Sequence, residues 1–170
     1  MISYSKIVVR IRPDDLEAVL AKFLWSCSAL LGLTGWAGSH VVKAALGIPQ
    51  ASPLGINYAD VLRLCLRFSG LNTELPGQVI LYHGESYISV GHTYKNERKA
   101  FVRAGPCDCV RIASDRADPN VEIELQPDGS LFLTFWFHDP QRNSVSGDVL
   151  RSLDSIPDAI VVEAKETKPA

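Results

Sequence analysis

The sequence predicts a single α+β domain in which a mainly antiparallel sheet packs against an N-terminal amphipathic helix. Three observations predict this class. The 170 residues are 46% hydrophobic and carry a net charge of -2, so the chain can form a core and is not expected to be disordered. Apolar residues recur at helical spacing from Leu16 onward, and strand-like alternation separated by turn residues dominates from Gln78.

The first two elements are a strand and a helix. Residues Ile7–Arg12 are rich in β-branched side chains and stop at Pro13, which predicts a strand. Asp14 is the predicted N-cap of a helix over residues 15–31, and Glu17 completes a capping box. The buried stripe of this helix is Leu16, Val19, Leu20, Phe23, Leu24, Cys27, Leu30 and Leu31.

The next elements are two shorter helices. Residues 33–38 are rich in glycine and predict a turn, and a short helix over His40–Leu46 follows it. A loop then leads to a helix capped by Asn57 and ending near Gly70.

One stretch is long enough to raise the question of a membrane span. The twenty residues Phe23–Val42 carry no formal charge, which is about the length that crosses a bilayer. Three glycines, four hydroxyl residues and His40 interrupt the stretch, and its apolar residues continue the stripe of the preceding helix. We therefore expect it to form half of the interior of a soluble domain.

The second half of the chain predicts strands. Residues 78–82 and 86–90 flank His83-Gly84-Glu85 as a hairpin, and 100–103 and 110–113 are short strand candidates. Residues 121–126 and 131–137 flank the turn Pro127-Asp128-Gly129, and the second of them is apolar on both faces, which predicts a central strand covered above and below. A helix over 146–153, a strand over 159–163 and a frayed tail over 165–170 complete the chain.

The outermost elements follow the order β-α-β-β-α-β, which is that of a split βαβ, or ferredoxin-like, sheet. In this interpretation residues 1–164 are one domain, and residues 33–118 are a long insertion that carries helices and a second small sheet. The alternative is a single α+β domain without that frame.

Two groups of residues suggest catalytic or metal chemistry. Cys107-Asp108-Cys109 offers two thiols that could bind zinc with His83, although structural zinc sites space paired cysteines more widely and need four ligands. His92 lies too far along the hairpin to join them. His138-Asp139 follows the predicted central strand, but adjacent strand residues point to opposite faces. The phosphate-binding, dinucleotide-binding and common hydrolase motifs are absent from the sequence.

Charge is unevenly distributed along the chain. Residues 118–170 contain ten acidic and four basic residues, whereas residues 95–103 mix basic and aromatic side chains. The basic run could contact a nucleic acid, but the interspersed Glu97 and the near-neutral whole chain favour a solvated loop. The acidic portion could instead steer association with a basic partner.

The leading hypothesis is a non-enzymatic protein-binding domain, such as an inhibitor, an immunity-type protein or an adaptor. It docks a basic protein through an acidic C-terminal face whose predicted residues are Glu122, Glu124, Asp128, Asp139 and Asp148. The alternative is a small metal- or thiol-dependent enzyme, or a ligand-binding domain, that uses Cys107 and Cys109 with His83 or His138. A nucleic-acid contact through residues 95–103 is the second alternative. We expect a cytoplasmic location, because the N-terminal residues do not resemble a secretory signal peptide.

Overall fold

Seven antiparallel strands form one open sheet in the computed structural model, and a few short helices accompany it. The structure describes residues 3–23, 35–49, 78–89, 105–113, 120–138 and 144–167. The elements are β1 (Tyr4–Ile11), the 3-10 turn η1 (Pro13–Asp15), α1 (Leu16–Phe23), α3 (Gly35–Ala45), β2 (Gln78–His83), β3 (Ser86–Ser89), β4 (Cys109–Ala113), β5 (Asn120–Leu125), β6 (Leu131–Trp136), α6 (Ser144–Leu153) and β7 (Ile160–Glu166). The fold is a single domain that is mainly β with a minor helical part.

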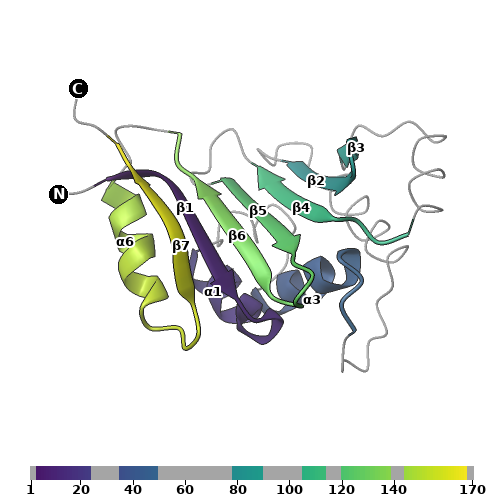
Figure 1. Ribbon diagram of the computed structural model, residues 1–170, viewed down its shortest axis with the longest axis horizontal. Coiled ribbons are helices and arrows are strands. Elements are labelled where there is room, and N and C mark those ends of the chain that lie inside the picture. Colours follow the sequence, from purple (N-terminus) through teal and green to yellow (C-terminus); the bar gives the residue numbers. More distant parts are fainter. Residues whose placement is uncertain are drawn as a thin grey trace.

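The strands lie in the order β3-β2-β4-β5-β6-β1-β7, and every neighbouring pair is antiparallel (Figure 1). β1 therefore lies between β6 and β7, two strands that come much later in the chain. The hairpins β2–β3 and β5–β6 are confirmed, and β6 is a central strand as predicted. The prediction of a second small sheet is wrong, because β4 pairs with both β2 and β5 and so joins all strands into one sheet.

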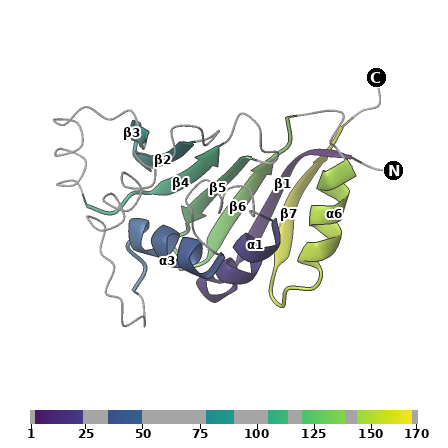
Figure 2. The same cartoon turned by 180° about the vertical axis from the view of Figure 1, so that it is seen from behind.

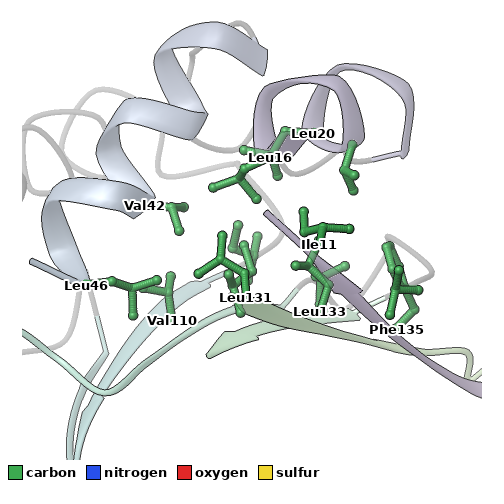
Figure 3. Close-up of a cluster of buried hydrophobic side chains, with 14 of the residues drawn as sticks. Ile11, Leu16, Leu20, Val42, Leu46, Val110, Leu131, Leu133 and Phe135 are labelled. Atoms are coloured by element: carbon green, nitrogen blue, oxygen red, sulfur yellow. The ribbon is translucent and has the colours of Figure 1, made fainter. Parts of the chain in front are cut away.

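One face of the sheet is covered by helices (Figure 2). The covered face carries alternate strand residues, and α1, α3 and α6 add side chains to the same core cluster. Leu16 and Leu20 of α1 and Val42 of α3 point towards the strands (Figure 3). The strand side chains of the cluster are Ile7, Val9, Ile11, Leu81, Val110, Ile112, Val121, Ile123, Leu131, Leu133 and Phe135. Each large side chain buried here contributes roughly 1.5–3 kcal/mol to folding.

The predicted cover on both faces of β6 is not what the structure shows. Leu131, Leu133 and Phe135 are fully buried, whereas Phe132, Thr134 and Trp136 on the other face are only half-buried. The helices of the described segments pack against one side of the sheet, and the alternate residues of β6 lie on the other side. The apolar character of those residues therefore marks a partly exposed surface.

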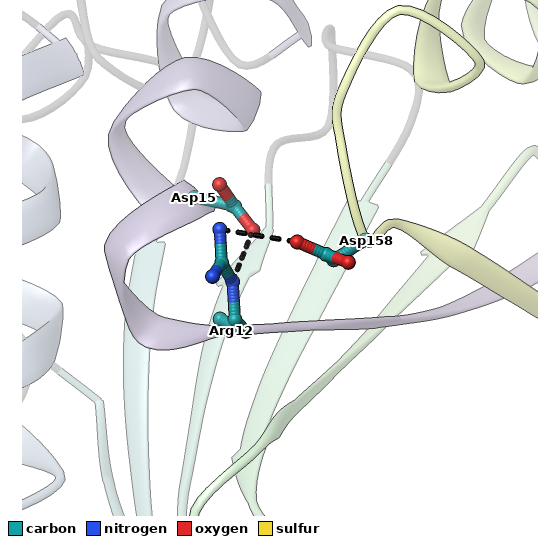
Figure 4. Close-up of polar contacts among 3 residues, drawn as sticks. All are labelled: Arg12, Asp15 and Asp158. Carbon is teal, nitrogen blue, oxygen red and sulfur yellow. Dashed lines mark hydrogen bonds and ion pairs between the residues drawn. The ribbon is translucent and has the colours of Figure 1, made fainter.

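The start of α1 differs from the predicted capping box. Asp14 lies inside η1, and α1 begins at Leu16, so Asp14 is not the N-cap. The carboxylate of Asp15 instead accepts a hydrogen bond from Arg12 Nε at 3.4 Å. Arg12 also pairs with Asp158 at 3.2 Å, which connects the end of β1 to the turn before β7 (Figure 4).

The predicted glycine-rich turn over residues 33–38 is also wrong where the structure describes it, because α3 already begins at Gly35. The predicted helix over 57–70 and strand over 100–103 lie outside the described residues. Near the C-terminus β7 continues to Glu166, and the Thr167 N–H donates a hydrogen bond to the Ser3 carbonyl at 2.9 Å. The paired chain thus extends beyond the predicted start of the tail.

Candidate functional site

The candidate site is the face of the sheet opposite the helices, which we call the open face. Cross-strand pairing assigns its residues to rows that run across the strands. One row joins Tyr82, Cys109, Glu124, Phe132 and Arg10, because each residue is the register partner of the next. The neighbouring row consists of Ile80, Arg111, Glu122, Thr134 and Val8. Glu122 and Glu124 therefore share these rows with residues from four other strands.

Aromatic side chains occur on this face both at the β2–β3 edge and on the inner strand β6. Tyr82 and Tyr87 lie on the paired strands β2 and β3, with ring centroids 5.9 Å apart, and Tyr87 is 64% exposed. On β6, the Trp136 ring lies 4.9 Å from Lys6 Nζ in a cation–π contact. Lys6 also pairs with Glu163 of β7 at 3.3 Å. The open face thus combines aromatic rings with charged groups.

The two glutamates of β5 differ in their surroundings. Glu122 pairs with Arg111 at 3.7 Å, and about one third of each side chain is exposed. Glu124 is exposed and forms no ion pair with any residue in the described segments. The charge of Glu122 is therefore balanced within the fold, and the charge of Glu124 remains available to a partner.

The other predicted acidic residues do not join this pair. Asp128 lies in the β5–β6 turn, where its carboxylate accepts hydrogen bonds from the Ser130 N–H at 2.9 Å and the Ser130 hydroxyl at 2.5 Å. These bonds lower the pKa of Asp128 below its ordinary value. Asp148 is on α6, in the helical layer, and pairs with Arg151. Asp139 lies outside the described residues.

The two cysteines have different environments. The Cys107 thiol is buried and donates a hydrogen bond to the Ala45 carbonyl at 3.1 Å, at the end of α3. Burial raises the pKa of Cys107 to about 12, with a further contribution from Cys109. Cys109 lies on the open face, where burial, followed by the charges of Glu122 and Glu124, raises its pKa to about 12. Neither thiol is prepared to act as a nucleophile at neutral pH.

The segment before β4 also packs closely against the end of α3. Gly47 has a φ of 72°, and a Cβ atom added there would lie 2.7 Å from Pro106 Cγ. Asp108 points towards the β2–β3 turn, where its carboxylate accepts a hydrogen bond from the Gly84 N–H at 2.6 Å. The contacts of Cys107 and Asp108 therefore hold the segment before β4 against α3 and against the β2–β3 turn.

Metal ligands do not cluster in the part of the chain that is described. It contains no group of three or more His, Cys, Asp or Glu residues arranged to hold a metal ion. His83 ends β2, and His138 is exposed just after β6. His92 and the basic run over 95–103 lie outside the described residues. The described helices include none that is long and apolar enough to cross a membrane.

Sequence reasoning missed the aromatic residues Phe132 and Trp136 and their basic neighbours Lys6 and Arg10. The signal was present in the apolar outer positions of residues 131–137, which we interpreted as a second buried face. Comparisons of the chain with models of protein families, with curated proteins and with solved structures found no match.

Proposed function

We propose that the chain is a non-enzymatic protein-binding domain, of the inhibitor, immunity or adaptor kind, that docks a protein on its open face. The observation that carries the proposal is the set of aromatic and arginine side chains on this face: Tyr82, Tyr87, Phe132, Trp136, Arg10 and Arg111. Aromatic residues and arginine are enriched at the centres of protein interfaces. The solvent side of an antiparallel sheet is ordinarily polar, so these residues call for a partner.

The charge of Glu124 indicates which kind of partner residue would bind there. Glu124 stands in the same row as Phe132 and Tyr82, and no basic residue of the described segments neutralises it. A basic side chain of the partner would pair with Glu124 while its apolar neighbours cover the Phe132 ring. This geometry supports the hypothesis of a basic partner with a contact centred on β5 and β6.

We also infer that strands β5, β6, β1 and β7 form a ferredoxin-like frame. What supports it is the spatial order β5-β6-β1-β7, with α1 following β1 and α6 lying between β6 and β7 in sequence. The chain between α1 and β5 then enlarges the frame with β2, β3 and β4 on the β5 side. The open face is therefore wider than the frame alone would provide.

The test compares proteins captured from a lysate of the source cells by immobilised wild type and by two charge reversals. Glu124→Lys removes the proposed contact, and Asp148→Lys is the matched control because Asp148 is an exposed acid on α6. We expect a protein that is retained by the wild type and by Asp148→Lys but lost with Glu124→Lys. With that protein purified, the association rate should fall about tenfold for Glu124→Lys at low salt, and the difference should shrink as salt rises.

Circular dichroism and urea unfolding establish that both variants are folded before the comparison. Phe132→Ser provides a second disruption of the same contact that does not depend on charge. Capture that is equal for all variants, or the absence of any protein that is lost with Glu124→Lys but kept by Asp148→Lys, would contradict docking on the open face.

A further inference from the structure

A further exposed feature of the described residues is the outer edge of β7. β7 is the last strand of the sheet, it pairs with β1 on one side only, and all seven of its residues are exposed. Ile160, Val161 and Val162 are 47%, 38% and 53% exposed. A long edge strand with exposed β-branched residues is a template for pairing with another strand.

The charges of β7 indicate what that other strand is. Lys165 lies directly opposite Lys6 of β1, so two like charges face each other across the sheet. Lys6 is compensated by Glu163 at 3.3 Å, whereas Lys165 forms no ion pair within the described segments. An acidic residue that approaches from the open edge would offset the repulsion between Lys165 and Lys6.

We propose that β7 pairs antiparallel with β7 of a second copy of this chain, with Ala164 on the two-fold axis. The axis is perpendicular to the sheet, so a residue and its register partner lie on the same face. Glu163 of each copy then stands opposite Lys165 of the other, and both residues already lie on the open face, where they pair with Val8 and Lys6. Each Lys165 gains an acidic register partner, whereas its register partner within its own chain is Lys6.

The same charges exclude the adjacent registers. A shift that centres the axis on Glu163 places the two copies of Glu163 opposite each other, and a shift that centres it on Lys165 places the two copies of Lys165 opposite each other. Like charges that face each other across a strand pair are destabilising. The small side chain of Ala164 allows close approach at the axis. In the proposed register Val162 lies beside the stem of the partner's Glu166.

The pairing of β7 with β1 is irregular at two places: between the partners of Val8 and Val9, next to Val162, and between the partners of Tyr4 and Lys6, at Glu166 and Lys165. Bulges twist an edge strand away from further pairing. The proposed contact therefore uses the segment from Val162 to Glu166, and the interface is short. Interfaces of this size give weak, concentration-dependent association.

Sedimentation equilibrium of the purified chain over roughly 10 μM to 1 mM tests the proposal. We expect a monomer–dimer equilibrium for the wild type, and dimerisation that is weaker by roughly tenfold or more for Glu163→Lys and for Lys165→Glu. The double variant that carries both substitutions restores opposite charges across the axis and should dimerise more strongly than either single variant. Asp154→Lys, an exposed acid at the end of α6, is the control that should leave the equilibrium unchanged.

A wild type that stays monomeric over this range would overturn the proposal. Single variants that dimerise like the wild type, or a double variant that fails to recover, would also overturn it, because the register rests on the two Glu163–Lys165 pairs. Thermal unfolding of every variant confirms that the sheet is intact. This test is independent of the proposed function, because Glu124 and Phe132 are unchanged in all of these proteins.

Discussion

The thiols of Cys107 and Cys109 should be almost inert at neutral pH, and the size of the effect follows from their environment. Burial raises the pKa of both from an ordinary value of 9.0 to about 12. At pH 8 a shift of this size lowers the fraction of thiolate about 1000-fold, and only the thiolate reacts with alkylating reagents. We therefore expect alkylation by iodoacetamide to be at least about 1000-fold slower for these cysteines than for an unstructured cysteine peptide.

Mass-spectrometric mapping of the alkylated peptides measures the rate at each cysteine separately, so the other cysteines of the chain do not interfere. The matched control is the same protein in concentrated urea, where both residues should react like the free peptide. Labelling of either residue in the folded protein within about tenfold of the peptide rate would refute the argument from burial. It would also revive the hypothesis of a thiol-dependent enzyme.

The same shifts predict how stability depends on pH. The folded state keeps both thiols protonated above the pH at which the unfolded chain ionises them. Their contribution to stability is therefore fully present below pH 9 and is lost as the pH rises towards about 12. The urea concentration at the midpoint of unfolding should therefore fall as the pH rises from 9 to about 12. Replacing both cysteines by alanine should make this fall smaller, as measured by urea titrations at several pH values.

Two further predictions concern contacts that hold the elements together. Gly47→Ala should lower the free energy of unfolding by about 1–3 kcal/mol more than Gly129→Ala does. Both glycines have a positive φ, but only at Gly47 would the added Cβ lie against Pro106. Equal losses of the free energy of unfolding in urea titrations would contradict this contact. Ser146→Ala should cost about 1–3 kcal/mol, because the fully buried Ser146 hydroxyl accepts a hydrogen bond from the Tyr4 N–H at 2.8 Å. An unfolding midpoint identical to that of the wild type would show that another acceptor replaces it.

Local patterns predicted the individual elements well where one face of a strand is buried. The alternation of residues 121–126, the turn at Asp128 and the apolar run of β6 lead directly to the observed hairpin. The turn at Gly84 is equally local, since a glycine with a φ of 60° is what a two-residue hairpin loop requires. These features depend on residues that are close together in the sequence, so they can be predicted from the sequence alone.

The pairing of the middle strands depends on distant residues and was not predicted. All strands belong to one sheet because β4 pairs with both β2 and β5. The alternation of apolar and polar residues over 109–113 predicts a strand but does not specify its partners. Helix α3 begins at Gly35 although glycine disfavours helices, because its later turns bury Val42 and Ala45. Tertiary packing overrides local propensity at this position.

The candidate site shows the same division. Glu122 and Glu124 share a face because residues two apart in a regular strand do so, and this part of the site followed from the sequence. Asp148 is close to them in sequence but lies in the helical layer, and Arg10 is far away in sequence but lies in the row of Glu124. Proximity along the chain is therefore a poor guide to which charges a partner would meet.

The position of β1 between β6 and β7 has a consequence for synthesis in the cell. The ribosome makes β1 roughly ten seconds before either neighbouring strand, at ordinary rates of translation. During that interval the backbone N–H and C=O groups of β1 lack the two strands with which they later pair. The nascent polypeptide therefore carries an unpaired β-strand, and its yield in living cells should depend on chaperones that bind such strands.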